Sequence, residues 1–504
     1  MKAIHLSLLL ILTARPYAMA DGSSYLTSAR VDPICVRQGL DYFHLMIGVA
    51  DPNIISITMN TQGLIKYQDT IVDPITLYDD GTHGDQEPND QVFTIDHISV
   101  AQPYANLAGD LTIRAQDFNF VYSDFSEVVS NEDIALTLHY IDPNVPICHA
   151  RVLDNDIQRT DYVVNIVQEL TGPFPAHTTD WWALINRYYD FFIDDRDFIF
   201  YAAPFNTSTA PGAAIHGHIS NNIQGIGLSS FDYSDSYGSS GRLKGAIGLF
   251  WGTAYGNSFN HEILHQWAAY LDPSLDLAKI DAHWDCIQAG RSGFGRLYGS
   301  YDYIEHVSDN TYRAWLDPAN EYYGFNNLEL YLMGLIGIED VNSPIVTLQN
   351  PVLQEIQNEG DIKYFIYTAD GMRNVSTDEI ISVEGPRIPD DVNSQKHFRS
   401  AIIVVYDRLL TDIELTYYDY AMREYEKATS EAHYGFTFQY STRGLADIST
   451  VLPISMDFAG FSKFASYWLE KDCGACGGAE LTDDGDVDID DLKVLSVNWL
   501  KGYP

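Results

Sequence analysis

Cationic side chains are scarce in this sequence of 504 residues. It has 29 Lys and Arg against 70 Asp and Glu, which gives a formal net charge of −41. A surface this acidic repels nucleic-acid phosphates and anionic lipid headgroups, so we expect no nucleic-acid partner and no peripheral membrane binding. The acidity fits calcium sites or a highly soluble surface, and composition alone does not separate the two.

Long apolar runs are missing as well. Beyond the N-terminus no stretch reaches the roughly 20 apolar residues needed to cross a bilayer, so we expect no membrane span. At the N-terminus, Lys2 precedes an apolar run from Leu6 to Leu12, followed by the small-x-small site Ala18-Met19-Ala20. This order is typical of a secretory signal peptide. It predicts a signal peptide over residues 1–20 and a secreted protein, extracellular or at the cell surface.

Cysteine is also rare, with five residues, too few for a disulfide scaffold in a chain of this length. Cys35 and Cys148 lie near opposite ends of the first predicted domain, so a bridge between them is one expectation. Cys473 and Cys476 form a CxxC pair without a second pair or a surrounding βαβ pattern. A local disulfide in a linker is therefore favoured over a zinc or redox motif. Cys286 is left over.

Residues 21–160 have the alternation of a half-buried β-sheet. Two stretches place an apolar residue at every second position: Ile55, Ile57 and Met59 in one, and Ile134, Leu136, Leu138 and Tyr140 in the other. Period two, with turn residues between the runs, predicts an all-β antiparallel sandwich with one face buried.

An acidic segment interrupts these strands. Leu77 to Asp85 reads LYDDGTHGD, and Asn89-Asp90 follow a few residues later. The segment resembles the LYDDG-x-x-GD stretch of Ig-like modules in bacterial surface and secreted proteins, which implies an Ig-like sandwich. Its acidic loop could hold calcium, or it could be an Asx-rich turn between strands.

Residues 161–470 differ from the preceding segment in composition and in the spacing of their apolar residues. Aromatic residues become dense, and apolar runs at helical spacing occur around His261 and from Leu328 to Leu335. Strand-like runs such as Ala246 to Phe250 lie between them. This mixture predicts an α+β domain. The Gly-, Ser- and Asp-rich stretch from Gly225 to Ser240 predicts a long ordered loop.

The most specific motif is His261-Glu262-Ile263-Leu264-His265, an HExxH run. On a helix, residues i and i+4 lie on one face about 6 Å apart, so the two imidazoles could share one tetrahedral Zn²⁺. Glu262 would project beside them as a general base toward water whose pKa the metal lowers to about 7. Apolar residues continue to Leu271, which predicts a buried helix that runs past the motif. The alternative is a core helix with two hydrogen-bonded histidines.

With Gln266 and Trp267, the motif resembles the HExxHxW run of gluzincins among the zincin metallopeptidases. Residues 261–336 also resemble secreted bacterial proteins that combine HExxHxW with a downstream His-Trp and an LDLYLMGL run. Here His283-Trp284 supplies the former, and Leu328 to Leu335 the latter, with Glu329 in place of Asp. The resemblance implies a zincin-like fold and roles for both His283 and Glu329 at the site. One of them would be a metal ligand and the other a supporting or transition-state-stabilising group.

The third ligand is open at this point, because a catalytic zinc site takes three protein ligands and leaves one position free. We favour three histidines, with His283 on the metal and Glu329 close by. A site of two histidines and Glu329, with His283 as oxyanion stabiliser, is the alternative, and Asp272 and Asp281 are weaker candidates. Tyr331, close to Glu329 in the sequence, could donate to the oxyanion.

Two further features are weaker candidates for functional residues. Tyr323 is a second candidate for an oxyanion donor. His216-Gly217-His218 could be a metal pair on a strand, but its Gly-rich surroundings favour a loop.

The tail, residues 471–504, begins with a Gly-rich linker and continues with an acidic run. Counting Gly485 as position six of a calcium loop puts Asp484 at position five, Asp488 at nine and Asp491 at twelve, which is the spacing of oxygen ligands. The predicted calcium ligands are Asp484, Asp486, Asp488 and Asp491. The run resembles one half of a dockerin repeat, which implies Ca²⁺ and a cohesin-like or cell-surface partner. Glu480 at position one and the lack of a second repeat depart from that pattern, and an acidic tail is the alternative.

These observations predict a multidomain chain: an N-terminal all-β sandwich, an α+β zincin-like domain and a short helical calcium-loop tail. The function that fits best is a secreted zinc-dependent hydrolase, an endopeptidase acting on polypeptides with Glu262 as general base. One alternative is a cell-surface binding or adhesion protein with a spent zincin domain, against which the intact Glu262 argues. The other is a zinc hydrolase of a non-peptide amide or ester, which the sequence does not separate from a peptidase.

Overall fold

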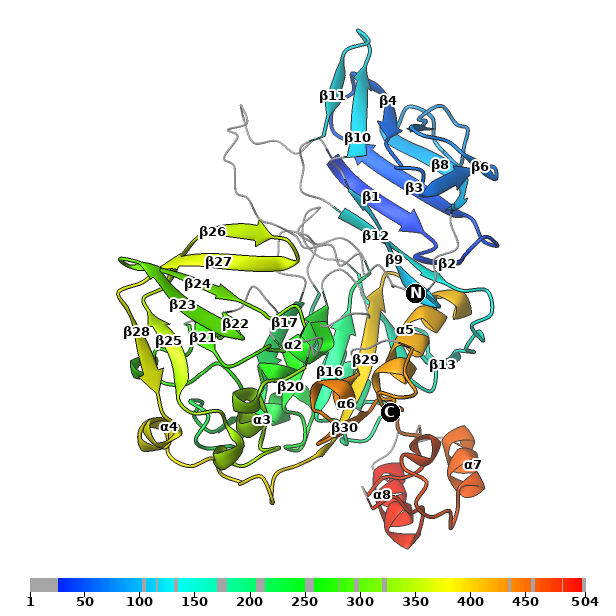
Figure 1. The fold of residues 1–504 in the computed structure, drawn as a ribbon. Coiled ribbons are helices and arrows are strands. Elements are labelled where there is room, and N and C mark those ends of the chain that lie inside the picture. The colour runs from blue at the N-terminus through cyan, green and yellow to red at the C-terminus, as the bar shows by residue number, and fades with distance from the viewer. Residues whose placement is uncertain are drawn as a thin grey trace.

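The computed structural model describes residues 26–500, apart from 102–105, 115–116, 131–134, 170–178, 205–213, 250–257, 280, 294–298, 320–323, 434–436, 455–457 and 483. The described chain is multidomain and rich in β-structure, with several sheets and eight α-helices (Figure 1). The predicted signal peptide lies outside these residues. Within the described part, no helix is long and apolar enough to cross a membrane.

The N-terminal domain consists of three sheets around one apolar core. In the first sheet the order is β1 (Leu26–Asp32), β3 (Phe43–Val49), β8 (Val92–Val100), β5 (Ile65–Tyr67) and β6 (Thr70–Ile71). In the second it is β11 (Glu127–Val129), β10 (Phe118–Tyr122), β4 (Ile54–Met59) and β7 (Ile75–Leu77). In the third it is β2 (Cys35–Arg37), β12 (Ala135–Ile141) and β9 (Ala108–Arg114).

The predicted alternation is wrong in detail on two of these strands. In β4, Ile54 is buried and Ile55 is 49% exposed, because the pairing with β10 shifts register next to Ile54. In β12, Thr137 and His139 are buried together with the apolar residues of the strand. The second face of β12 is not solvent-exposed because helix α5 (Asp412–Tyr425) packs against it.

The central domain is built on an eight-stranded mixed sheet. Its order is β13 (Arg151–Asp154), β14 (Ile157–Arg159), β15 (Val163–Val167), β29 (His397–Tyr406), β16 (Phe198–Ala202), β20 (Gly245–Leu249) and β17 (Ala214–His218), with β30 (Asp447–Ser449) beside β29. Strands β15, β29, β16 and β20 are parallel, and β17 is an antiparallel edge strand. Since β13 and β14 belong to this sheet, it begins at Arg151, before the predicted boundary at residue 160.

Helices cover both faces of this sheet. Alternate residues of the parallel strands enter two separate cores, as Ile199 and Phe200 of β16 do. Helix α1 (Trp181–Tyr189) packs on one face. On the opposite face lie α2 (Ser258–Leu264), α3 (Asn327–Met333), α5 and α6 (Phe438–Ser441). Helix α5 also contacts β2, β9 and β12 and so joins the central sheet to the N-terminal domain.

A lobe of smaller sheets lies beside the central sheet, on the left of Figure 1. One sheet has the order β22 (Ser300–Tyr301), β21 (Ile287–Gln288), β25 (Ile345–Gln349) and β28 (Gly371–Val375). The other has the order β23 (Tyr303–Ser308), β24 (Thr311–Trp315), β27 (Ile362–Thr368) and β26 (Val352–Glu359), and α4 (Thr377–Glu384) follows β28. The predicted loop at 225–240 contains β19 (Phe231–Asp232), which pairs with β18 (Ser220–Asn221).

The C-terminal module contains α7 (Phe458–Ser466) and α8 (Ile489–Leu500), and its small core also includes Ile193 and Ile454, which precede the module. Phe464 of α7 belongs to this core, so the module begins near residue 458, before the predicted boundary at 471. Arg399 of β29 holds the module on the central domain. Its guanidinium contacts Glu480 of the module and lies 3.2 Å from the carboxylate of Asp195. All three side chains are buried.

The disulfide predictions have opposite outcomes. Cys473 and Cys476 form the expected local disulfide. The expected Cys35–Cys148 bridge is wrong: both residues are free cysteines. Cys35 pairs with β12 on the sandwich side, and the sulfur of Cys148 instead contacts the hydroxyl of Thr416 in α5.

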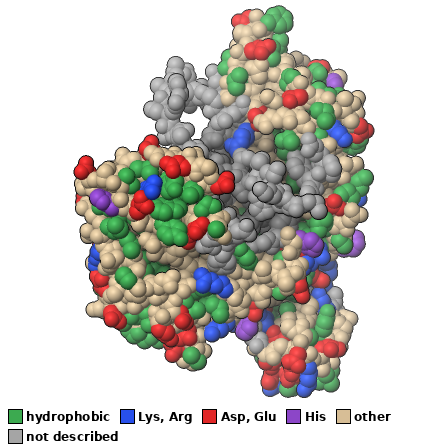
Figure 2. Space-filling view, viewed as in Figure 1, with side chains coloured by type: hydrophobic (Ala, Val, Ile, Leu, Met, Phe, Trp, Pro, Cys, Tyr) green, Lys and Arg blue, Asp and Glu red, His purple; other side chains and the backbone are tan. Residues whose placement is uncertain are grey.

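Acidic side chains are spread over the lobes on the face that Figure 2 shows, and they gather on the C-terminal module at its lower right. The many acidic side chains on this face agree with the net charge of the chain. No single lobe accounts for the acidity.

Candidate metal centre

Helix α2 carries the HExxH motif and is fixed to the protein body by its other face. Phe259 and Ile263 lie in the core between the helix and the sheet. Asn260 lies inside the helix and is fully buried. Its amide donates to the hydroxyl of Ser441 at 2.8 Å, and the hydroxyl of Tyr425 donates to its carbonyl at 2.8 Å. These contacts fix the rotation of the helix, and with it the direction of the histidines.

The helix is shorter than predicted. It ends at Leu264, so His265 is the first residue beyond it. The amides of Trp267 and Ala268 both donate to the Leu264 carbonyl at 3.0 Å, and the chain reverses at Ala269, where φ is 69°. The apolar residues up to Leu271 are buried, as expected, but they pack as a turn and not as a helix.

Edge strand β17 supports this helix end. A carbonyl in the last turn of a helix has no partner within the helix, and here Nε2 of His218 donates to the His265 carbonyl at 2.9 Å. Nε2 of His216 lies 3.3 Å from the side-chain oxygen of Gln266. The prediction of a loop at residues 216–218 is therefore wrong. The strand has glycine at position 217 because a Cβ there would lie 2.7 Å from the ring of Trp181.

Three imidazoles converge at the site: His261 and His265 from the motif, and His283 from the segment that follows. One nitrogen of each lies within 4.8 Å of the other two. The Nε2 atoms of His261 and His283 are 3.4 Å apart. Two ligands about 2.05 Å from a tetrahedral zinc ion are separated by roughly 3.3 Å, so this spacing fits a shared ion.

The electrostatic surroundings of His265 and His283 favour the neutral form of these two side chains. Burial lowers the pKa of His265, and the neighbouring histidines lower it further. Burial also lowers the pKa of His283, although the carboxylate of Asp281 opposes the shift. Neutral imidazole is the form that coordinates a metal ion. The cluster is therefore ready to bind a cation at neutral pH.

Glu262 lies beside the cluster. Its side chain is 6% exposed, and one carboxylate oxygen is 3.9 Å from Nε2 of His261. Burial raises the pKa of Glu262 to about 8. A cation on the histidines would favour the ionised carboxylate, so the proton affinity of Glu262 depends on the metal.

Glu329 is not part of the three-residue cluster, and its carboxylate is held by protein donors. Trp284 donates its indole N–H to Oε1 at 2.8 Å, and the hydroxyl of Ser292 donates to the same oxygen. The amides of Gly293 and Asn326 donate to Oε2 at 3.1 and 2.9 Å. The side chain is fully buried. The structure therefore does not place Glu329 as a metal ligand, the alternative that the sequence left open.

These contacts give Glu329 a supporting role for His283. Trp284 directly follows His283, and Glu329 binds its indole, so the carboxylate of α3 holds the segment that carries the third imidazole. Burial raises the pKa of Glu329 to about 7, and its four hydrogen-bond donors oppose that shift. His283 and Glu329, which both belong to the resemblance over residues 261–336, are thus joined through Trp284.

Of the remaining predicted site residues in the described chain, only Asp281 lies beside the histidines. The hydroxyl of Tyr331 accepts from the amide of Arg387 at 3.3 Å, and no contact among the described residues joins it to the cluster. Asp281 has one oxygen 3.6 Å from Nδ1 of His283. Asp272 caps a short turn by accepting from the amide of Ser274 at 2.9 Å. Tyr323 lies outside the described residues.

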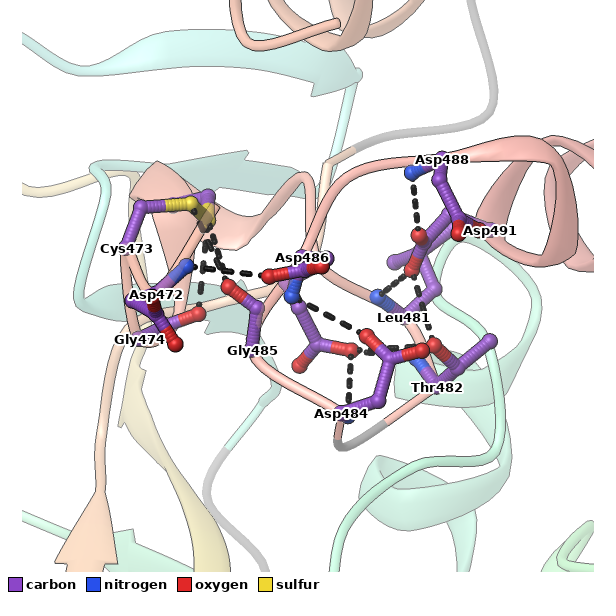
Figure 3. Close-up of a disulfide and its surroundings, with 12 residues drawn as sticks. Asp472, Cys473, Gly474, Leu481, Thr482, Asp484, Gly485, Asp486, Asp488 and Asp491 are labelled. Atoms are coloured by element: carbon purple, nitrogen blue, oxygen red, sulfur yellow. Dashed lines mark hydrogen bonds between the residues drawn. A yellow bond between two sulfur atoms is a disulfide. The ribbon is translucent and has the colours of Figure 1, made fainter. Parts of the chain in front are cut away.

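The predicted calcium loop has its carboxylates turned to its own backbone (Figure 3). Asp484 accepts from the amide of Asp486 at 3.0 Å, and Asp486 accepts from the amide of Asp472 at 3.0 Å. Asp491 accepts from the amide of Asp488 at 2.8 Å with one oxygen, and its other oxygen accepts from Leu481. Within the described part of the loop, the four predicted ligands do not converge to within 4.8 Å of one another.

The acidic segment of the sandwich does converge. Oxygens of Asp79, Asp85 and Asp90 lie within 4.8 Å of one another. Asp79 also accepts from the amides of Asp90 and Gln91 at 3.1 Å. An Asx-rich turn therefore exists here, and it gathers three carboxylates.

Compared with family models, curated proteins and solved structures, the chain matches none of them.

Proposed function

We propose that this protein is a zinc-dependent hydrolase, specifically an endopeptidase, that acts outside the cell. The observation that carries the proposal is the convergence of His261, His265 and His283 beside the buried carboxylate of Glu262. Three neutral imidazoles with one position left for a substrate or water are the donor set of a catalytic zinc site. A core helix with two hydrogen-bonded histidines would not need the third.

A bound Zn²⁺ would supply a Lewis acid that polarises a carbonyl and lowers the pKa of water to about 7. Glu262 accepts a proton from the attacking water and returns it to the leaving nitrogen. A general base works best when its pKa is close to the working pH; burial raises the pKa of Glu262, and a bound cation would oppose that shift and favour the ionised carboxylate that accepts the proton. His218 and Glu329 keep the segments of His265 and His283 in position through their hydrogen bonds.

Strand β17 favours a polypeptide as the substrate. It is the last strand of the large sheet, and among the described residues no strand pairs with its outer edge. An extended peptide can pair with such an edge through main-chain hydrogen bonds. Because His218 of β17 contacts His265, a peptide on this edge would lie next to the metal centre. A small amide or ester would not use the edge.

The C-terminal module fits a supporting role in this proposal. We infer that its loop binds Ca²⁺ through Asp484, Asp486, Asp488 and Asp491, whose carboxylates exchange their backbone amide donors for the ion. Glu480 at position one of the loop is engaged by Arg399 of the central domain. This contact favours a module that is docked on its own chain over one that captures a cohesin-like partner.

Metal analysis together with a peptide digest tests the proposal. The wild-type protein should bind one zinc and cleave members of a mixed peptide library. His261→Ala and His283→Ala should lose the zinc and the cleavage. His397→Ala is the matched control, because this histidine is 80% exposed and pairs with Asp447 on the surface. Full zinc retention in both site variants would refute the metal centre. Zinc binding with ester cleavage and no peptide cleavage would refute the peptidase assignment alone.

A further inference from the structure

A cavity of about 430 Å³ lies away from the metal centre, between the central domain and the C-terminal module. Its walls come from residues 146–149, from strands β13 and β14, from the loop at 160–162, from α5 and from α7. This volume is within the range of small-molecule sites. The proposed hydrolysis assigns no role to it.

The cavity concentrates positive charge in a protein that has little of it. Four cationic side chains and two carboxylates are among its described walls: Arg151, Arg159, Arg423, Lys463, Asp161 and Asp419. Nε of Arg423 lies 2.8 Å from Asp419, and Nζ of Lys463 lies 2.8 Å from Asp161. Two of the four cations therefore pair with the two carboxylates.

Arg159 is the distinctive group of the cavity. It is 6% exposed, and its guanidinium donates to two carbonyl oxygens, of Thr160 at 2.8 Å and of Pro453 at 2.5 Å. No carboxylate of the described chain lies within 4.0 Å of it. Buried arginines are nearly always paired with an opposite charge.

The surroundings of Arg159 destabilise its positive charge, which a bound anion would stabilise. Burial, with Asp161 opposing it and the charges of Arg151 and Arg196 adding to it, lowers the pKa of Arg159 to about 10. The ring of Phe192 packs 5.3 Å from the guanidinium, which fixes its plane but does not neutralise the charge. An oxyanion in the cavity would supply the missing counter-charge.

We propose that this cavity binds a small molecule through an oxyanion, a carboxylate or a phosphate, with Arg159 as the buried anchor. Arginine recognises both groups because its planar fork matches two oxygens. Arg423 and Lys463 lie in the same cavity with about a third of each side chain exposed, so they can turn toward a ligand. Because Lys463 belongs to α7 and Arg423 to α5, the ligand bridges the C-terminal module and the central domain.

The test uses calorimetric titration of the whole protein with inorganic phosphate and, separately, with succinate, at an ionic strength held constant with sodium chloride. We expect saturable one-to-one binding of at least one probe, and the stronger probe identifies the oxyanion. Arg423→Gln and Lys463→Gln should each weaken binding at least tenfold. Both side chains are partly exposed, so these variants should fold, and thermal unfolding checks this.

Lys493→Gln is the matched control. It removes the same charge from the same module, but Lys493 lies on α8, 67% exposed and paired with Asp490, and it does not line the cavity. Binding should be unchanged in this variant. The proposal is overturned if neither probe binds saturably, or if all three variants bind like the wild type. The readout does not involve hydrolysis, so it is independent of the proposed activity.

Discussion

Replacing Glu329 by glutamine separates a residue that supports His283 from one that binds the metal. Each carboxylate oxygen of Glu329 accepts two hydrogen bonds, from Trp284 and Ser292 on one side and from Gly293 and Asn326 on the other. Glutamine has one acceptor oxygen. Whichever way its amide turns, an NH₂ group then faces at least one buried N–H donor, since only the hydroxyl of Ser292 can reverse and accept.

The expected cost follows from these contacts. In the better orientation one buried donor, the indole N–H of Trp284, is left unpaired, at about 1–3 kcal/mol, so Glu329→Gln should lower the free energy of unfolding by about 1–3 kcal/mol. Because Trp284 adjoins His283, zinc affinity should fall as well, by about 10–100-fold, as for other groups that orient a metal ligand. His283→Ala should abolish tight binding.

Urea denaturation measures the stability, and competition with a chromophoric chelator measures the zinc affinity. Glu359→Gln is the control, since Glu359 is an exposed residue of β26 and its replacement should change neither quantity. The reasoning is refuted if Glu329→Gln leaves stability and affinity unchanged. Loss of all zinc binding without loss of stability would mean that Glu329 is itself a ligand.

Three further predictions concern the metal centre and one concerns the tail. Glu262→Gln should keep the zinc and reduce hydrolysis by about 10²–10⁴-fold; unchanged turnover would exclude it as the base. Removing zinc with a chelator should lower the thermal midpoint, since zinc at 100 times its Kd stabilises by about 2.7 kcal/mol, and an identical melting curve would argue against a specific site. His218→Leu removes the hydrogen bond to the His265 carbonyl, so it should cost about 0.5–1.5 kcal/mol and weaken zinc binding, whereas His397→Leu should do neither. Calcium titrated into the whole protein should give heat that Asp488→Asn diminishes, and equal heats in both would place calcium elsewhere.

The local pattern around the motif predicted the central features of the candidate site. Spacing i, i+4 placed His261 and His265 on one side of the chain, and the sequence favoured His283 as their partner. These inferences worked because they depend on contacts within about twenty residues. The end of α2 at Leu264 was not predictable, because a turn and a helix bury the apolar residues up to Leu271 equally well.

Other features depend on partners far away in the sequence. The edge strand at His216 and His218 forms through pairing with β20, which no local signal reveals. Glu329 is held by donors 3 to 45 residues away, so its role was undetermined between ligand and support. The burial of both faces of β12 arises from α5, more than 270 residues later. The residue patterns predicted three successive segments. They did not predict that β13 and β14, which lie before residue 160, belong to the central sheet.

Anomalous diffraction at the zinc edge from crystals of the zinc-loaded protein tests the central claim most directly. The account predicts one zinc ion with imidazole nitrogens of His261, His265 and His283 at about 2.0–2.1 Å, and with the carboxylate of Glu329 still bound to Trp284. A zinc ion coordinated by Glu329 in place of His283, or located away from these histidines, would contradict it.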